Sequence, residues 1–143
     1  MGGSDPISLE QAVARLTAMA APVGVETVSV AQGLGRVLAE PVVAAFDQPP
    51  FTASAMDGWA LRAADLAGAS AENPLELTRI GEVPAGRPLA RGVGPGETAR
   101  IYTGGALPVG ADAVAMQEDV AETATGARFT HPVAPGRHVR PSG

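Results

Sequence analysis

The first part of the chain has apolar positions at helical spacing. Such residues recur every three or four positions: Leu9, Ala12, Val13, Leu16, Met19 and Ala20. This spacing is typical of one face of an α-helix. Ser8 stands directly before these residues, and Gln11 follows Ser8 by three positions. This capping-box pattern predicts where the helix begins. We expect a helix of about a dozen residues that Pro22 and Gly24 end, with its apolar face packed on the rest of the chain or on a second subunit.

After Glu26 the spacing of the apolar residues along the chain changes. Residues 27–30 alternate like a half-buried strand, residues 32–36 suggest a short helical turn, and residues 38–44 form an apolar run interrupted by Pro41. Further short strands are predicted at Gly58–Leu61, Leu75–Val83, Thr98–Tyr102, Ala113–Gln117, Ala127–Thr130 and His138–Arg140. The pattern predicts a mainly β fold with α (α+β): an N-terminal helix and a small, barrel-like domain of short strands.

Composition and charge exclude some classes of partner and favour one cell compartment. The 143 residues suit one ordinary domain or two small ones. Aromatic residues make up only 3%, so we expect a core of Val, Leu, Ile and Ala. A net charge of −5 argues against nucleic acid and anionic membranes as partners. The chain has no cysteine, no signal-peptide pattern and no apolar run of membrane-spanning length, which favours the cytoplasm.

A loop over residues 49–60 is the first candidate site. The Pro49-Pro50 pair restricts the backbone, and Asp57-Gly58 then places a carboxylate on a tight turn. Such an aspartate has either a structural role in the turn or a catalytic one. Asp47 lies at the other end of the loop, and Glu118 and Asp119 end a later strand, where both suit a solvated strand end. Carboxylates of this kind suit Mg²⁺, which takes one or two of them and completes its shell with water and phosphate oxygens.

A second candidate loop follows the strand near residue 100. Thr103, Gly104 and Gly105 could turn backbone N–H groups and a hydroxyl towards a bound phosphate or oxyanion. The same Thr-Gly-Gly sequence is also an ordinary strand ending. It matches neither the P-loop nor the dinucleotide-binding fingerprint.

Other catalytic patterns find no support. His131 and His138 are separated by prolines and a glycine, so they form no helical metal pair and are expected at the surface. No Gly-x-Ser-x-Gly elbow surrounds Ser54. Met56 and Trp59 are interpreted as packing residues in preference to ligand-stacking ones.

Taken together, the two loops closely resemble the amino-terminal region of the molybdopterin molybdenumtransferases. This is the MoeA family, to which the E domain of gephyrin also belongs. The similar segments cover nearly the whole chain: Ile7–Ala12, Gly35–Ala39, Pro49–Phe51, Ser54–Ala60, Arg100–Gly104, Pro108–Val114 and Gly136–Arg140. The chain departs from the family pattern at Trp59, where Tyr is usual, and at Thr52-Ala53, where relatives carry Asp-Asn or Pro-Ala.

The resemblance implies an enzyme that inserts molybdate into adenylyl-molybdopterin, with Mg²⁺-assisted release of AMP. It implies that Asp57 and Thr103 are catalytic and that Asp57 is a ligand of Mg²⁺. By the same resemblance, their neighbours in the two loops are expected to bind substrate: Ser54, Met56, Gly58 and Gly104.

The resemblance also implies a domain plan. Residues 1–44 and 135–143 would form parts of an elongated dimerisation domain, and residues 45–134 an inserted β-rich domain. The family's pterin-binding and final β domains have no counterpart here, so we expect a fragment that is inactive alone. A homodimer of the full-length form and a molybdopterin-adenylyltransferase as upstream donor are the expected partners. The alternative is a non-catalytic interaction module, because gephyrin uses the same fold for receptor scaffolding.

Overall fold

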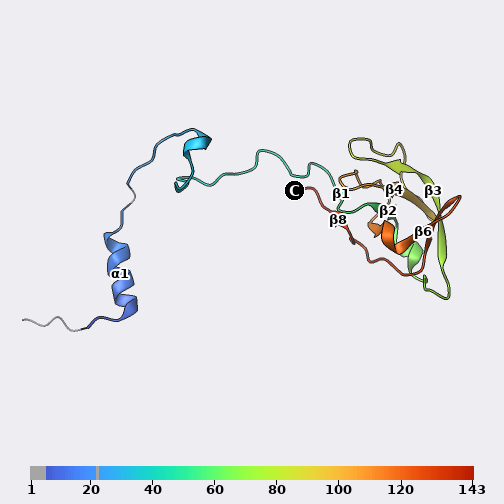
Figure 1. Cartoon of the computed structure of the whole chain (residues 1–143), viewed down its shortest axis with the longest axis horizontal. Helices are drawn as coiled ribbons and strands as arrows, with labels where there is room; N and C mark the ends of the chain where they lie inside the picture. The colour runs from blue at the N-terminus through green and yellow to red at the C-terminus, as the bar shows by residue number, and fades with distance from the viewer. Residues whose placement is uncertain (1–5, 22) are drawn as a thin grey trace, which may run out of the picture. The chain divides into compact units, whose positions relative to one another are not determined.

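The computed structural model describes residues 6–21 and 23–143. The chain divides into two compact units, unit 1 within residues 1–43 and unit 2 over residues 44–143. Both units are visible in Figure 1. Within the described residues, no helix has the length and apolar character that crossing a bilayer requires.

Unit 1 contains the predicted helix, α1 (Leu9–Met19). Its capping box is confirmed: the Gln11 N–H donates to Ser8 Oγ, and the Ser8 N–H donates to Gln11 Oε1, both at 3.2 Å. Each bond satisfies a donor that the first turn of a helix leaves unpaired. The helix ends at Met19, and Pro22, expected to help end it, lies outside the described residues. No residue of α1 is buried within unit 1, and the expected partner of its apolar face stays a prediction.

The rest of unit 1 corrects two predictions. The strand expected over residues 27–30 is wrong, and residues 38–44 form no strand either. The helical turn lies slightly earlier than predicted, as the 3₁₀ helix η1 (Val30–Gln32). The reason is physical: alternation gives a segment one apolar side, but a strand also needs a partner for its N–H and C=O groups. No such partner exists among the described residues of unit 1.

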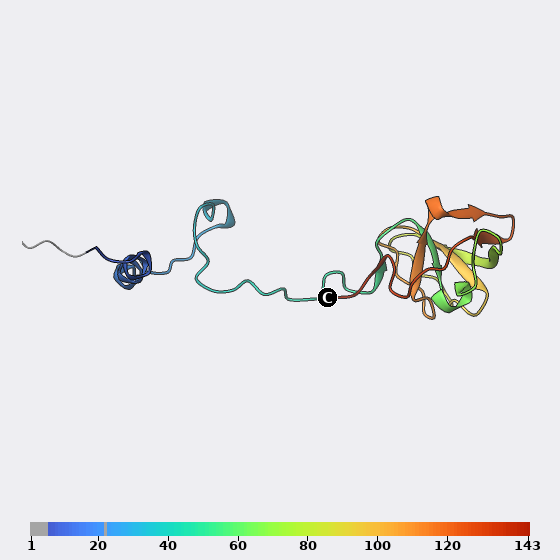
Figure 2. The same cartoon turned by 90° about the horizontal axis from the view of Figure 1, so that it is seen from below.

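Unit 2 is built on one curled sheet of six strands. In spatial order these are β5 (Ala113–Met116), β2 (Gly58–Leu61), β4 (Glu97–Ile101), β3 (Leu75–Val83), β7 (Gly126–Phe129) and β6 (Val120–Glu122). All neighbours pair antiparallel except β3 and β4, which are parallel. Figure 2 shows the curvature of the strands of unit 2 from below. Two 3₁₀ helices, η2 (Ala63–Leu66) and η3 (Gln117–Asp119), follow β2 and β5. The predicted mainly β fold with one α-helix is confirmed.

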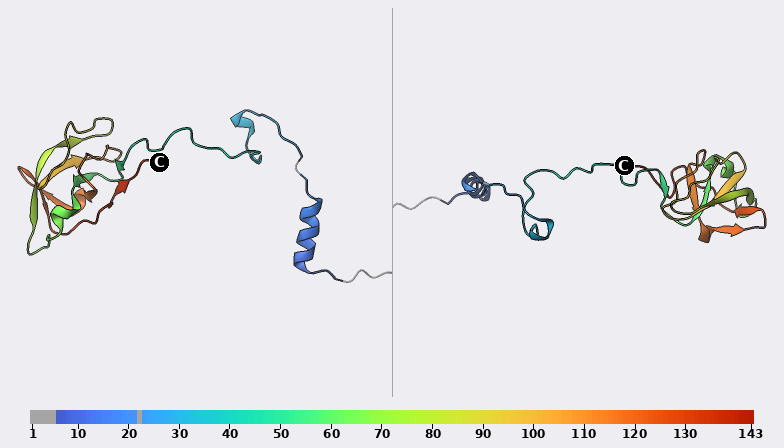
Figure 3. Two further views of the ribbon diagram at one scale, coloured as in Figure 1. Left: turned by 180° about the vertical axis from the view of Figure 1, so that it is seen from behind. Right: turned by 90° about the horizontal axis from the view of Figure 1, so that it is seen from above.

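A short second sheet joins the two ends of unit 2. Strand β1 (Ala53–Ser54) pairs antiparallel with β8 (Val139–Arg140), with Ala53 opposite Arg140. The pairing continues beyond the strands, because the Gly143 N–H donates to the carbonyl of Pro49 at 3.2 Å. The chain therefore enters and leaves unit 2 side by side, as the rear view in Figure 3 shows. The predicted insertion of this domain, with boundaries at residues 44 and 135, stays a prediction.

The core of unit 2 mixes aliphatic side chains with two aromatic ones. Trp59 and Phe129, each 2% exposed, join the expected Leu, Val, Ile and Ala side chains on the two faces of the sheet. Gly58 and Gly126 lie in the sheet where strands approach closely. A Cβ on Gly58 would collide with the carbonyl oxygen of Ala115, and one on Gly126 with that of Leu77. Glycine is thus required at both positions by packing.

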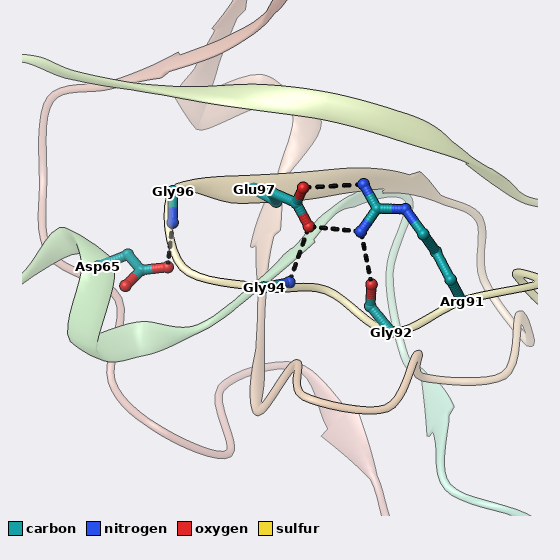
Figure 4. Close-up of polar contacts among 6 residues, drawn as sticks. All are labelled: Asp65, Arg91, Gly92, Gly94, Gly96 and Glu97. Atoms are coloured by element: carbon teal, nitrogen blue, oxygen red, sulfur yellow. Dashed lines mark hydrogen bonds and ion pairs between the residues drawn. The ribbon is translucent and has the colours of Figure 1, made fainter.

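An ion pair holds the turn before β4. Both Nη atoms of Arg91 donate to the Glu97 carboxylate, at 2.7 and 2.8 Å, and the Gly94 N–H donates to Glu97 Oε2 at 2.9 Å (Figure 4). These bonds lower the pKa of Glu97 to about 2, with the Arg91 hydrogen bonds as the largest cause. The carboxylate thus links both sides of the turn that leads into the central strand β4.

Candidate functional site

Asp57 and Thr103, predicted from two distant loops, lie in direct contact. Asp57 immediately precedes β2 and Thr103 follows β4, and these strands pair antiparallel with Gly58 opposite Ile101. The start of one strand therefore meets the end of the other at the same edge of the sheet. The Thr103 N–H and the Thr103 hydroxyl both donate to Asp57 Oδ1, each at 2.7 Å. The half-buried carboxylate is thus fixed by two donors of one residue.

These contacts favour the ionised carboxylate. The Thr103 N–H and then the Thr103 hydroxyl lower the pKa of Asp57, the charge of Arg100 lowers it further, and partial desolvation opposes them. Among the described residues, no group donates a hydrogen bond to Asp57 Oδ2. The site therefore presents an oriented, negatively charged oxygen whose remaining bonding capacity is unused.

Arg100 is a neighbour that sequence reasoning did not single out. Its guanidinium lies 5.0 Å from the centre of the Tyr102 ring and 5.7 Å from that of Trp59. Nη1 donates to the Gly58 carbonyl at 2.9 Å, and Nη2 donates to the side chain of Gln117. The Gln117 N–H in turn donates to the Asp57 carbonyl at 3.1 Å. Arg100 thus contacts Gly58, which follows Asp57 in the chain, and Gln117, whose N–H bonds to the Asp57 carbonyl.

A signal for Arg100 did exist in the sequence. It is the last charged residue before Thr103 on a predicted strand, and it stands two positions before the only Tyr of the chain. What sequence could not supply is the register that places Arg100 opposite Trp59.

The anion cradle suggested for the Thr-Gly-Gly loop is wrong for its backbone. All three N–H groups bond within the protein: Thr103 to Asp57 Oδ1, Gly104 to the Ser54 carbonyl at 2.9 Å, and Gly105 to the Tyr102 carbonyl at 2.8 Å. Gly104 adopts φ +80°, the left-handed geometry that glycine accepts without strain. The loop's N–H groups therefore hold its own shape and that of the Asp57 loop.

The predicted substrate-binding residues differ in accessibility. Ser54 and Gly58 are buried, Met56 is half-buried and Gly104 is exposed. The Ser54 hydroxyl donates to the Met56 carbonyl at 2.6 Å, which braces the turn that carries Asp57. Ser54 and Met56 thus shape the loop, and a role of these four residues in binding substrate stays a prediction.

A small hollow opens beside Thr103. It has a volume of about 180 Å³, and its lining joins both loops to the β1–β8 ribbon: Pro49, Phe51, Ala53, Ser54, Ala55, Thr103, Gly104 and Arg140. Arg140 makes no ion pair among the described residues. The hollow therefore offers a cation next to Thr103, on a rim that an anionic group can reach.

The described residues could supply one ligand of a metal site, not a complete site. Mg²⁺ is commonly held by one or two carboxylates, with water and phosphate oxygens in its other positions. Asp57 supplies one ionised oxygen, while the described part of the chain contains no group of three or more His, Asp or Glu that could hold a metal. Asp47 instead accepts a bond from the Ser142 hydroxyl at 3.4 Å. Asp57 could thus be one ligand of an ion whose other ligands come from elsewhere.

Comparison with known proteins identifies the family. The family model described as "MoeA N-terminal region (domain I and II)" matches residues 7–143. The chain belongs to the MoeA family. The predicted resemblance is therefore confirmed over almost the full length of the sequence.

Individual relatives agree. A molybdopterin molybdenumtransferase of Staphylococcus epidermidis is 38% identical over 120 residues, which is 84% of this chain and 29% of the relative. One from Staphylococcus aureus is 38% identical over 118 residues, covering 82% of this chain and 28% of its own length. The crystal structure of a molybdopterin biosynthesis MoeA protein from Pyrococcus horikoshii OT3 has a TM-score of 0.75 and 44% identity over 82% of this chain and 31% of that one.

The chain spans less than a third of the length of these MoeA relatives. The activity, substrates and partners of a whole MoeA protein are therefore matters for proposal here.

Proposed function

We propose that this chain supplies the domain I and II part of a molybdopterin molybdenumtransferase. The reaction is insertion of molybdate into adenylyl-molybdopterin with release of AMP. The observation that supports this proposal is the bond pair from Thr103 to Asp57, because it joins the two family motifs into one ionised, oriented carboxylate at an accessible edge. An interaction module without catalysis has no need for such a pair, so its position on one edge favours the enzyme.

Each residue has a defined part in the proposal. Thr103 orients Asp57 and leaves Oδ2 available, and Arg100 fixes the flanking backbone and stabilises the negative charge. Asp57 would hold Mg²⁺, which when bound draws charge from the phosphate oxygens of the adenylate. Arg140, on the rim of the hollow, would attract the anionic end of the substrate. The Thr103 hydroxyl donates to Asp57, so we assign it orientation of the carboxylate in place of oxyanion binding.

The proposed site would be completed by residues from further MoeA domains. One carboxylate and an open hollow of about 180 Å³ are too little to enclose a pterin nucleotide. We infer that the remaining contacts come from further MoeA domains, in a homodimer that receives its substrate from a molybdopterin-adenylyltransferase in the cytoplasm. The 143-residue chain alone is therefore expected to release no AMP from adenylyl-molybdopterin.

A chimera tests the activity directly. Residues 7–143 of this chain would replace the matching part of the Pyrococcus horikoshii MoeA relative, and AMP release and molybdenum insertion would be measured. Asp57→Asn should lower turnover by about a hundredfold or more, the range expected on removal of a catalytic group. Glu82→Gln is the matched control, because this exposed acid on β3 makes no side-chain hydrogen bond or ion pair among the described residues, and it should stay within about twofold of the parent.

Thermal unfolding of the same proteins separates chemistry from folding. The proposal requires that Asp57→Asn unfold near the parent temperature while turnover collapses. Normal turnover in Asp57→Asn, or loss of activity in proportion to loss of stability, would show that Asp57 is only a structural residue of the turn.

A further inference from the structure

A second and larger hollow lies away from Asp57 and Thr103. Residues 130–138, here called the arch, connect β7 to β8 without forming a strand. The arch returns to the sheet at its far end, where the Gly136 N–H donates to the Asp112 carbonyl at 2.7 Å and the Val114 N–H to the Arg137 carbonyl at 2.9 Å. Beneath it is a space of about 500 Å³, within the usual size range of small-molecule sites. Its lining shares no residue with the hollow beside Thr103.

The floor of this space is apolar. Ala115 and Phe129 belong to the buried core and also line the hollow, and the partly buried Val120 and Val133 pack against the same core. Ala115 and Phe129 are only 5% and 2% exposed, so the apolar surface open to a ligand comes from the partly buried Val120 and Val133 that pack against them. A flat apolar group placed there would cover these two valines.

The rim carries groups that favour an anion. Arg137, His131 and His138 line the hollow together with Thr130 and a single acid, Asp119. Arg137 forms no ion pair among the described residues, so its charge is not neutralised by a neighbouring carboxylate. Guanidinium binds carboxylate and phosphate through paired N–H groups, and imidazole can add a further donor. In a chain of net charge −5, this places positive charge beside an apolar floor.

The backbone at His138 is an independent sign. His138 has φ +54°, and it is the only non-glycine residue at positive φ in the described chain. A side chain other than glycine is uncommon there, and such conformations often mark functional sites. Glycine would fit this conformation freely, yet the chain has a histidine that lines the hollow.

We propose that the hollow under the arch binds a small organic anion with a flat apolar body. The apolar body would lie on Val120 and Val133, and the anionic group would bind Arg137 with support from His138. This site is separate from the proposed molybdenum-insertion site and does not depend on it. The residues disfavour a metal centre as the alternative, since no group of three potential ligands occurs in the described part of the chain.

Benzoate is a suitable probe because it has one carboxylate on one ring. Titration into the isotope-labelled chain, followed by NMR, should shift signals of Val120 and Val133 saturably, with a Kd of about 1 mM or below. Benzyl alcohol keeps the ring without the charge, and inorganic phosphate keeps the charge without the ring. Each should bind at least about tenfold more weakly if both halves of the hollow contribute. Phenyl phosphate in place of benzoate tells whether phosphate or carboxylate is preferred.

Three variants make the test specific. Arg137→Gln should weaken benzoate at least about tenfold. His138→Gly should also weaken it while the fold is kept, because glycine accepts the observed φ and only the imidazole is lost. Arg87→Gln is the control, an exposed arginine with no side-chain hydrogen bond or ion pair among the described residues, and should bind like the parent.

The result that overturns the proposal is equally clear. It fails if benzoate gives no saturable shift up to about 10 mM, if benzyl alcohol binds as well as benzoate, or if Arg137→Gln and Arg87→Gln bind alike. None of these outcomes bears on AMP release by the chimera, so the two proposals can fail separately.

Discussion

At the scale of single residues, the contact between Asp57 and Thr103 combines one acceptor oxygen with two donors. Because both bonds end on Oδ1, the carboxylate cannot rotate without losing both of them. The second oxygen is thereby directed without a partner of its own among the described residues. A threonine can give this result because its backbone and side chain each carry a donor.

The Thr103 hydroxyl therefore has a measurable effect on ionisation. Thr103→Val keeps the N–H donor and removes the hydroxyl, so the pKa of Asp57 should rise towards its ordinary value. A carboxyl whose pKa is lowered by folding stabilises the protein above its unfolded pKa, and this contribution is lost as the pH falls through the folded value. Thr103→Val should thus reduce the acid-dependent part of stability.

Carboxyl ¹³C NMR of Asp57 during a pH titration checks this expectation. Thr103→Ser keeps a hydroxyl and is the matched control, which should titrate like the parent. An unchanged pKa of Asp57 in Thr103→Val would mean that the hydroxyl contributes nothing to the charge state.

Sequence reasoning reached this pair but not its surroundings. Asp57 and Thr103 were predicted from their motifs, and the structure places them together. Arg100 was missed because its importance depends on register, which puts it opposite Trp59 and within reach of Gln117. Of the two interpretations left open for the Thr-Gly-Gly loop, the backbone anion cradle was wrong, because glycine content indicates that N–H groups can turn, not where they donate.

At the scale of elements, the close packing of β2 and β5 sets the position of Asp57. Gly58 follows Asp57 directly, and any Cβ there would meet the backbone of Ala115 on β5. Gly58→Ala should therefore force the two strands apart and destabilise unit 2 by about 1–3 kcal/mol, the usual cost of overpacking. Urea unfolding gives the free energy.

A matched glycine provides the control for this change. Gly68 has open space where a Cβ would stand, with no heavy atom within 4 Å, and its φ is not positive. Gly68→Ala should therefore be neutral or slightly stabilising. Equal stability of the two variants would contradict the claim that β2 and β5 need glycine to approach.

The turn before β4 should respond to acid. The pKa of Glu97 is lowered from 4.5 to about 2, so its contribution to stability is complete above about pH 4.5 and is lost as the pH falls towards 2. Glu97→Gln removes the charge and should flatten the dependence of stability on pH in this window. Denaturant unfolding from pH 5 to pH 2 measures the effect, and Glu82→Gln, an acid for which no partner is present among the described residues, should keep the parent's slope.

The elements that sequence could not predict are short or depend on pairing with distant strands. The longer strands β3 and β4 and the helix α1 were found within one or two residues, because their periodicity and capping are local. Strand β1 has only two residues, and its partner β8 lies at the other end of the domain. Strand β6 was missed, and the parallel pairing of β3 with β4 has no local signal either, since both depend on contacts across the sheet.

At the scale of the whole molecule, the two units differ in what holds them together. Unit 2 has a core that includes Trp59, Leu61 and Phe129, whereas α1 buries no residue. An isolated helix of 11 residues is marginal in water. In the 143-residue chain, the amides of α1 should therefore exchange with solvent at least about a hundredfold faster than those of β2 and β4.

Hydrogen exchange followed by NMR gives the two rates in one experiment. Strong protection of α1 equal to that of the sheet would contradict the expectation and would mean that its apolar face is covered in solution. Ser8→Ala should accelerate exchange in α1 alone, because it removes the cap without touching unit 2.

The paired ends of unit 2 also determine how it would respond to force. A load applied at residues 44 and 143 meets the ribbon of β1 and β8 first, and it acts along the hydrogen bonds between Pro49 and Gly143 and between Ala55 and His138. Such bonds open one after another, like a zipper, at low tension. The load reaches the six-stranded sheet only after the ribbon has opened. The ribbon should therefore unfold before the residues that orient Asp57 are disturbed.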